Sequence, residues 1–260
     1  MARAYPAQAL TTDRRRIKAP LLLVIALMAS IARQPASAAT EGQAPTLQPY
    51  TAHYQTTARG FDLSVTRKLE TSDNGDYILT NGGKMLVVGF HEISLFRIND
   101  GEILPISYIF QGTGLVKRRR ELQFPPQPGK ISSLYKDKWY DLPYTEATLD
   151  RMNQMEQLRL ELLKDPEAVL DVTLRVADGK RVKDSRLVLI AREMLSTPLG
   201  PVETLHYERL HDDADRKSDI WFAPQWDYLM VKTVHIEDGD PVEMILTSAT
   251  LGGQPVIAAN

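Results

Sequence analysis

The chain has 260 residues, with 31 lysines and arginines against 33 aspartates and glutamates, and it contains no cysteine. The missing thiols exclude disulfides, zinc–thiolate sites and cysteine catalysis. Stability must therefore come from a packed core. The chain is long enough to build such a core as a single domain.

The first 38 residues have the order of a secretory signal peptide. A basic segment, Arg14–Lys18, precedes the apolar run from Pro20 to Ala32, and Ala36-Ser37-Ala38 is a small-x-small cleavage site. The apolar run is short for a membrane span, which needs roughly 20 residues. We expect cleavage after Ala38 and a periplasmic mature protein with no transmembrane span.

Cleavage would make the protein distinctly acidic. Residues 1–38 hold six basic residues and one acidic residue, so 25 basic and 32 acidic residues remain, a net charge of −7. Affinity for nucleic acid comes mostly from neutralising phosphates, so an acidic protein is a poor candidate for it. We expect no nucleic-acid partner.

The first half of the mature chain has the pattern of β-strands. A flexible leader is predicted for residues 39–48, and from Tyr50 onward apolar and polar residues alternate, which is typical of strands with one buried face. Turn sequences such as Ser72–Asp76 separate the strands. The strands are predicted at residues 50–55, 61–70, 77–80, 84–98, 103–111, 116–124 and, as a short one, 134–139.

The period then changes to that of a helix. Between Thr145 and Lys164 apolar residues, among them Met152 and Met155, recur at helical spacing, and Asp165-Pro166 ends the pattern. One amphipathic helix is predicted at about 145–164. Its stripe of Met and Leu is typical of a helix packed on a sheet, although it could also line a pocket for an apolar ligand.

Strands resume in the second half. Leu170–Val176 alternates most regularly, Ala177–Lys180 is a hairpin turn, and Thr197–Gly200 is a tight bend between two more strands. Further strands are predicted near 220–222, 229–236 and 242–251. The fold class is mainly β (α+β): a curled antiparallel sheet forming an open barrel or half-barrel, with one helix. We predict a single domain at 49–252 and a tail at 253–260.

Candidate metal and catalytic motifs are incomplete. His91-Glu92 begins like a zinc-protease motif, but Leu95 stands where the second histidine is needed. The run from His206 to Asp219 is rich in His and Asp, yet it lacks the spacing and glycine of a calcium loop, which favours a solvated turn. We expect no metal, no cofactor and no assignable catalytic residue.

Other groups could bind a ligand without catalysing a reaction. Lys117–Arg120 could bind phosphate, including lipid headgroups, although solvated or paired charges on a strand are the commoner arrangement. Trp139 and Trp221 are ordinary for the interior of a sheet, but a curled sheet can enclose a cavity lined by such rings. The candidate ligand-binding residues are therefore Met152, Met155, Trp139 and Trp221.

Four motifs in this order resemble a known family. They are a Tyr-x-Ala-x-Tyr strand at Tyr50, Trp139–Tyr144 before the helix, Glu193–Gly200 ending in Thr-Pro-Leu-Gly, and Ile220–Pro224. Together they resemble the exported bacterial family catalogued as domain of unknown function 3108, over nearly all of residues 50–251. The chain departs from it at Leu229–Lys232, where the family tends to read Leu-Pro-Val-Arg.

The resemblance implies a protein of the Gram-negative envelope and assigns no activity. Its fold is analogous, more loosely, to periplasmic lipoprotein-carrier proteins, which hold acyl chains in a half-barrel, but a fold does not fix a function. The leading hypothesis is a non-enzymatic protein that binds a lipid-like apolar ligand or an envelope protein. The alternatives are an envelope hydrolase that uses scattered carboxylates and histidines, and a structural scaffold of an envelope complex.

Overall fold

The computed structural model describes residues 45–258, except 59–60, 86–87, 115–116, 127–128, 146 and 238. The predicted signal peptide, its cleavage site and most of the predicted leader lie outside these residues. Residues from Gln43 onward form one compact unit, and the following description concerns that unit alone.

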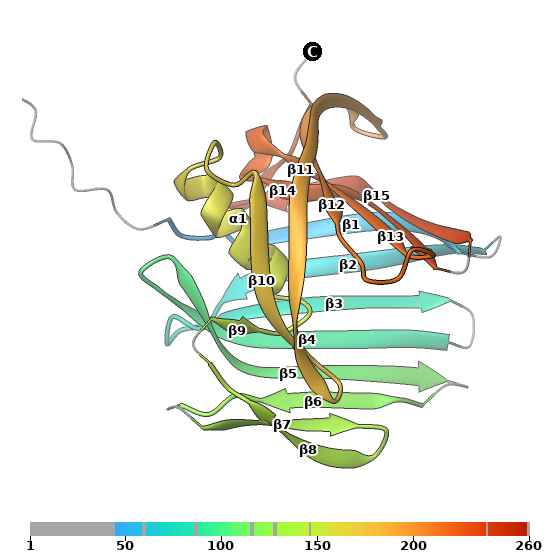
Figure 1. Ribbon diagram of the computed structural model, residues 1–260. Coiled ribbons are helices and arrows are strands. Elements are labelled where there is room, and N and C mark those ends of the chain that lie inside the picture. Colours follow the sequence, from blue (N-terminus) through green and yellow to red (C-terminus); the bar gives the residue numbers. More distant parts are fainter. Residues whose placement is uncertain are drawn as a thin grey trace, which may run out of the picture. The chain divides into compact units, whose positions relative to one another are not determined.

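The strands of this unit form one large sheet (Figure 1). Its order is β8-β7-β6-β5-β4-β3-β2-β1-β15-β14-β13-β12-β11-β10-β9, with β16 beside β15. Apart from the parallel pair β9 and β10, neighbouring strands are antiparallel. The bounds are β1 Tyr50–Ala58, β2 Phe61–Thr71, β3 Tyr77–Met85, β4 Val88–Asn99, β5 Glu102–Gly114, β6 Arg119–Gln123, β7 Lys130–Tyr135, β8 Lys138–Pro143, β9 Thr148–Leu149, β10 Asp171–Asp178, β11 Arg181–Thr197, β12 Gly200–Arg209, β13 Lys217–Ala223, β14 Leu229–Glu237, β15 Asp240–Leu251 and β16 Gln254–Pro255.

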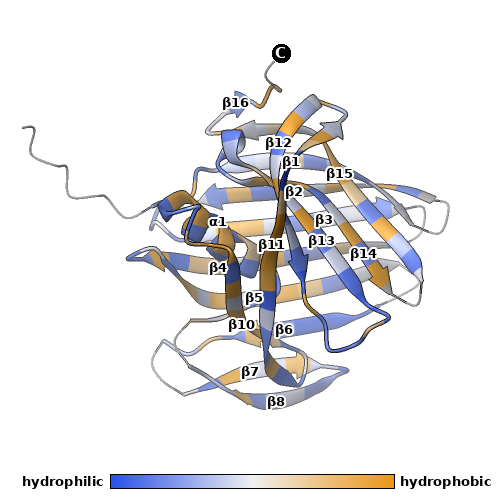
Figure 2. Ribbon diagram, turned by 45° about the horizontal axis from the view of Figure 1, so that its top comes forward, coloured by the Kyte–Doolittle hydropathy of each residue, from blue (hydrophilic) through white to orange (hydrophobic). Residues whose placement is uncertain are grey.

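This topology confirms the predicted mainly β fold with a curled, open antiparallel sheet. Two meanders, β1–β8 and β10–β15, are joined side by side where β1 pairs with β15. The sheet curls so that β9 contacts β5 and β11 contacts β8, but its end strands do not pair with each other. Hydropathy alternates along many strands, as expected where one face is buried (Figure 2).

Two strand predictions were wrong in detail. The two strands predicted at 77–80 and 84–98 are present as β3 and β4, but β3 continues to Met85 and β4 begins at Val88. The single short strand predicted at 134–139 is the hairpin of β7 and β8. Lys136 and Asp137 form the turn of this hairpin, with φ of 51° and 60°. Such a turn usually carries Asn or Gly, so a Lys-Asp pair gives little sequence signal for it.

The helix is shorter than predicted. Helix α1 spans Gln154–Lys164, and its end at Lys164 agrees with the predicted stop at Asp165-Pro166. The segment before it forms β9 and a turn in which Oδ1 of Asp150 accepts hydrogen bonds from the backbone N–H groups of Met152 and Asn153, at 2.7 and 2.9 Å. An aspartate that binds nearby backbone amides competes with helix formation.

Helix α1 lies inside the curl of the sheet, so it is buried on more than its apolar side. Its side chains hydrogen-bond to β1, β2, β5 and β12. Leu158, Leu160 and Leu162 belong to the core, but Glu156 and Arg159, which an amphipathic helix would expose, are only 1% exposed. The pattern of apolar residues therefore predicted the helix but not the burial of its charged face.

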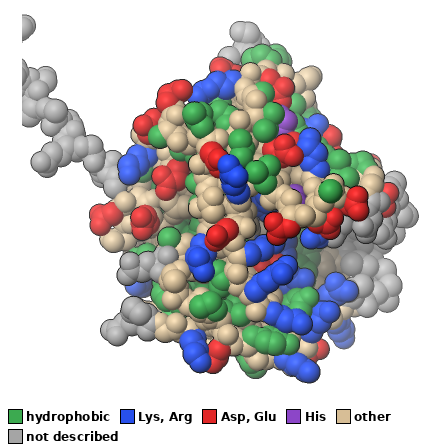
Figure 3. Space-filling model, in the orientation of Figure 1, with side chains coloured by type: hydrophobic (Ala, Val, Ile, Leu, Met, Phe, Trp, Pro, Cys, Tyr) green, Lys and Arg blue, Asp and Glu red, His purple; other side chains and the backbone are tan. Residues whose placement is uncertain are grey.

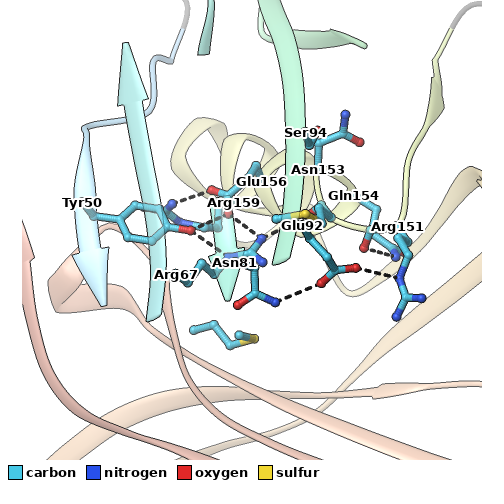
Figure 4. A network of polar contacts seen from close by, with 12 residues as sticks. Tyr50, Arg67, Asn81, Glu92, Ser94, Arg151, Asn153, Gln154, Glu156 and Arg159 are labelled. Carbon is cyan, nitrogen blue, oxygen red and sulfur yellow. Dashed lines mark hydrogen bonds and ion pairs between the residues drawn. The ribbon is translucent and has the colours of Figure 1, made fainter. Parts of the chain in front are cut away.

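The buried charges form a closed network (Figure 4). Glu156 Oε1 accepts hydrogen bonds from Tyr50 Oη at 2.8 Å and from Arg67 Nη2 at 3.1 Å, and Oε2 accepts one from Arg159 Nη1 at 2.6 Å. Arg159 also donates to the carbonyl oxygen of Asp227, which follows the 3-10 turn η1 (Pro224–Trp226). Burial alone would raise the pKa of Glu156, but Arg159 and Arg67 outweigh it and hold that pKa below its ordinary value.

Replacing Glu156 with Gln removes the carboxylate that pairs with Arg67 and Arg159 and leaves these two buried guanidinium groups without that counter-charge. We expect the free energy of unfolding to fall by about 3–5 kcal/mol, as for other buried ion pairs that lose one partner. Urea denaturation measures this change. The exposed Glu203→Gln is the matched control, and a loss as small as that of the control would show that the network contributes little to stability.

Candidate functional site: a basic groove

The turn of the β10–β11 hairpin contacts β6 and β7, which belong to the first meander of the sheet. Ser133 Oγ of β7 donates a hydrogen bond to the carbonyl oxygen of Gly179 at 2.5 Å, and Arg120 of β6 pairs with Asp178 at 3.2 Å. Gly179 has a φ of 62°, and a Cβ atom there would lie 3.2 Å from the ring of Tyr135. Any other residue would be strained where the hairpin turn meets β7, which favours glycine there.

Beside this contact lie three adjoining cavities of about 520, 350 and 630 Å³. The first shares Arg120, Asp178 and Lys183 with the second, and it shares Lys183, His211 and Arg216, among others, with the third. We call this continuous space the basic groove. Its charged and histidine side chains are Arg120, Arg151, Asp178, Lys180, Arg181, Lys183, Asp184, Arg209, His211, Asp212, Asp213, Arg216 and His235.

The groove is locally cationic although the predicted mature protein is acidic. Seven Lys and Arg side chains line it against four Asp side chains. Lys and Arg side chains gather around the turn of the β10–β11 hairpin on the face shown in Figure 3. A concave surface that collects one sign of charge raises the local concentration of ligands of the opposite sign.

Two groups in the 520 Å³ cavity lack hydrogen-bond partners within the described part of the chain. They are Oγ of Ser185, a side chain that is only 5% exposed, and the buried Nε of Arg209. Arg209 Nη2 donates to Oε1 of Gln154 at 3.2 Å, a neutral partner. Burial, together with the charge of Arg151, lowers the pKa of Arg209 to about 10.

Asp150 fixes the segment that brings Arg151 and Gln154 to the groove. Its Oδ2 accepts hydrogen bonds from Ser94 Oγ at 2.6 Å and from Asn153 Nδ2 at 2.9 Å. Arg151 Nε lies 3.6 Å from Oε1 of Glu92, a contact also seen in Figure 4. These contacts place one guanidinium group and one amide at the 520 Å³ cavity, which Arg151, Gln154, Ser185 and Arg209 line and which we call the inner end of the groove.

A histidine pair lies at the same cavity. Nε2 of His211 is 2.8 Å from Oγ of Ser218, and the same hydroxyl oxygen is 2.7 Å from Nδ1 of His235. Burial, followed by the positive charge of Arg209, lowers the pKa of His211. Ser218 itself is buried.

The His- and Asp-rich run from His206 to Asp219 does not form one site. His206 stacks on Trp221 and lies between Glu193 and Asp219, at 3.2 and 2.9 Å. His211 instead faces the basic groove, and the intervening Asp212, Asp213 and Asp215 are exposed in the loop, as the predicted solvated turn requires. In the described part of the chain, no three Asp, Glu or His side chains are placed to hold a metal ion.

The four predicted ligand-binding residues are dispersed. Met152 is buried in the core, Met155 packs against the core, Trp139 is 56% exposed on the edge strand β8, and Trp221 is buried and donates to Glu193 at 2.7 Å. None of them lines the basic groove. Of the candidate ligand groups singled out in the sequence, Arg120, His211, Asp212 and Asp213 do line it. Ser185, Lys183 and Arg209 gave no signal, since they are ordinary polar positions of strands.

Comparison with known proteins places the fold. The chain matches the family "Protein of unknown function (DUF3108)" over residues 47–247. A β-barrel-like protein of Brucella abortus, from the domain of unknown function DUF1849, has a TM-score of 0.51 at 12% identity and covers 79% of this chain and 98% of its own. A protein of Bacteroides fragilis with a YmcC-like fold, described as a "putative exported protein", has a TM-score of 0.32 at 11% identity. The match covers 79% of this chain and 96% of that protein.

No curated protein matches the chain. Within the described residues, no helix combines the length and the apolar character needed to cross a bilayer.

The pKa of Asp150 gives a test of this end of the groove. Burial outweighs the hydrogen bonds from Ser94, Asn153 and Met152 and raises the pKa from 3.8 to about 6. Because the folded state binds this proton more tightly than the unfolded state, its stabilising effect is present below pH 3.8 and is lost as pH rises through 6.

We therefore expect the free energy of unfolding of the wild type to fall relative to that of Asp150→Asn between about pH 4 and pH 7. The difference should reach about 3 kcal/mol, at 1.4 kcal/mol for each pH unit between the two pKa values. Denaturant titrations of both proteins across this range measure it. A constant difference between the two proteins would show that Asp150 does not titrate there.

Proposed function

The chain belongs to the DUF3108 family of proteins of unknown function, and we propose that it is an exported, non-enzymatic binding protein of the Gram-negative envelope whose ligand lies in the basic groove. Export is supported by the basic, apolar and small-residue order of residues 1–38. Binding is supported by one observation above all, the cationic groove beside the turn of the β10–β11 hairpin.

The lining of the groove favours a polar ligand over the wholly apolar one that the sequence suggested. Arginine and lysine side chains border the groove, and covering them with hydrocarbon would remove them from water without supplying a partner, which costs free energy. The core, in contrast, holds large side chains such as Tyr54, Phe96 and Leu158 at 1% exposure or less. A lipid would fit this groove through its headgroup.

One observation favours a hydrolase as the second candidate. Ser218 Oγ lies within hydrogen-bond distance of both His211 and His235, and a histidine that accepts a hydroxyl proton can activate a serine. We expect no turnover of p-nitrophenyl acetate or p-nitrophenyl phosphate that depends on this hydroxyl. Turnover by the wild type that Ser218→Ala abolishes, with the variant still folded, would replace the binding proposal with an enzymatic one.

Native mass spectrometry of the protein purified from the periplasm tests the binding proposal. We expect a small molecule to remain bound to the wild type and its occupancy to fall several-fold in Lys183→Glu, because that variant reverses a charge in the groove. Lys138→Glu, at an exposed position outside the groove, is the matched control and should keep the wild-type occupancy.

Other outcomes of that experiment contradict the proposal. A stoichiometric protein partner without a small molecule would favour the scaffold alternative. Equal loss of the small molecule from both charge-reversal variants would place it outside the groove.

A further inference from the structure

We infer that the inner end of the basic groove is a subsite for a phosphate group, carried by free phosphate or by a phosphate ester such as a lipid headgroup. This inference rests on the proposed binding function and gives its ligand a chemical class. Its core is formed by Ser185 of β11 and Arg209 of β12, together with Arg151, which lies just before α1.

The first argument is hydrogen bonding. Buried side-chain nitrogen and oxygen atoms are nearly always paired, so those without a partner mark a place where a ligand can bind. Within the described residues three such atoms occur, and two of them, Ser185 Oγ and Arg209 Nε, belong to one cavity. Both can donate a hydrogen bond, and an anion accepts hydrogen bonds from both kinds of group.

The second argument is charge. In the described part of the chain Arg209 forms no ion pair, and its side chain donates a hydrogen bond to the neutral Gln154. Of the nearby carboxylates, Asp178 pairs with Arg120 at 3.2 Å, Asp184 lies 3.8 Å from Arg175, and Glu92 lies 3.6 Å from Arg151. Asp212 also lines the cavity, but it is exposed. The inner end of the groove therefore holds the partly buried positive charge of Arg209, which no carboxylate among the described residues pairs with, and a bound anion would compensate it.

The third argument is shape. Donors approach the cavity from β11, β12 and the segment before α1, and Lys183 adds positive charge from β11. A tetrahedral phosphate presents oxygens in several directions, whereas a carboxylate presents two in one plane. The cavity of about 520 Å³ has the size of a small-molecule pocket, so the phosphate can be one end of a larger ligand.

Isothermal titration with inorganic phosphate at 150 mM NaCl tests this subsite. We expect Arg209→Gln to weaken phosphate binding at least tenfold and Ser185→Ala to weaken it several-fold. Arg209→Lys, which keeps the charge but lacks Nε, should also weaken it. The control is Arg119→Gln, which removes an exposed arginine outside the groove and should bind phosphate as the wild type does; circular dichroism verifies that each variant is folded.

Two comparisons separate the sources of the phosphate group. Tighter binding of vesicles of phosphatidylglycerol than of phosphatidylcholine, lost in Arg209→Gln, would identify a lipid headgroup, whereas binding of phosphate and glycerol phosphate alone would identify a soluble ligand. Succinate is the carboxylate probe and should bind more weakly than phosphate.

Several outcomes overturn the inference. They are no measurable phosphate binding by the wild type, equal weakening in Arg119→Gln, or succinate binding as tight as that of phosphate. If phosphate fails while a small molecule still co-purifies in a manner that depends on Lys183, the phosphate subsite is wrong and the proposed binding function stands.

Discussion

The arrangement of this protein depends on one buried carboxylate. Glu156 takes hydrogen bonds from Tyr50, Arg67 and Arg159, so helix α1 is held against β1 and β2 at a defined height inside the curled sheet. A charged group in the core is stable only when its partners are in place. Apolar packing alone would tolerate several positions of the helix, but only one of them brings Glu156 to its partners. Because Gln154 begins the same helix and contacts Arg209, the network also sets one wall of the basic groove.

The open sheet explains why a groove exists at all. In a closed barrel the end strands pair with each other, whereas here the β10–β11 hairpin reaches the other half through a few contacts of its turn, chiefly Ser133 with Gly179 and Arg120 with Asp178. Between these contacts and the core there is room that side chains do not fill. Positive charge has collected in this room, whereas the chain as a whole carries 31 basic and 33 acidic residues. That contrast is why we assign a binding role to the groove and not to the apolar interior.

The sequence predicted the fold better than the site, for physical reasons. Alternation of apolar and polar residues is a local property, and it predicted the strands around Tyr50 and Leu174. The end of the helix at Lys164 was equally local, since Asp165-Pro166 follows it. It could not predict the hairpin turn at Lys136-Asp137, which lacks the usual residues, nor the late start of α1, which depends on the hydrogen bonds of Asp150. The groove depends on pairings between residues far apart in sequence, such as Arg120 with Asp178. Ser185 and Arg209 became candidates only because the fold buries Ser185 Oγ and Arg209 Nε at one cavity without hydrogen-bond partners among the described residues.

The central claim is that the Nε–H group of Arg209 binds an anion. Nuclear magnetic resonance of protein labelled with ¹⁵N in its arginines observes this group directly, and Arg209→Lys assigns its signal. The account predicts that the Arg209 Nε–H signal shifts and saturates as phosphate is added, at concentrations that leave the signals of exposed arginines such as Arg97 and Arg119 in place. An Arg209 signal that stays fixed, or that moves only together with those of the exposed arginines, would contradict it.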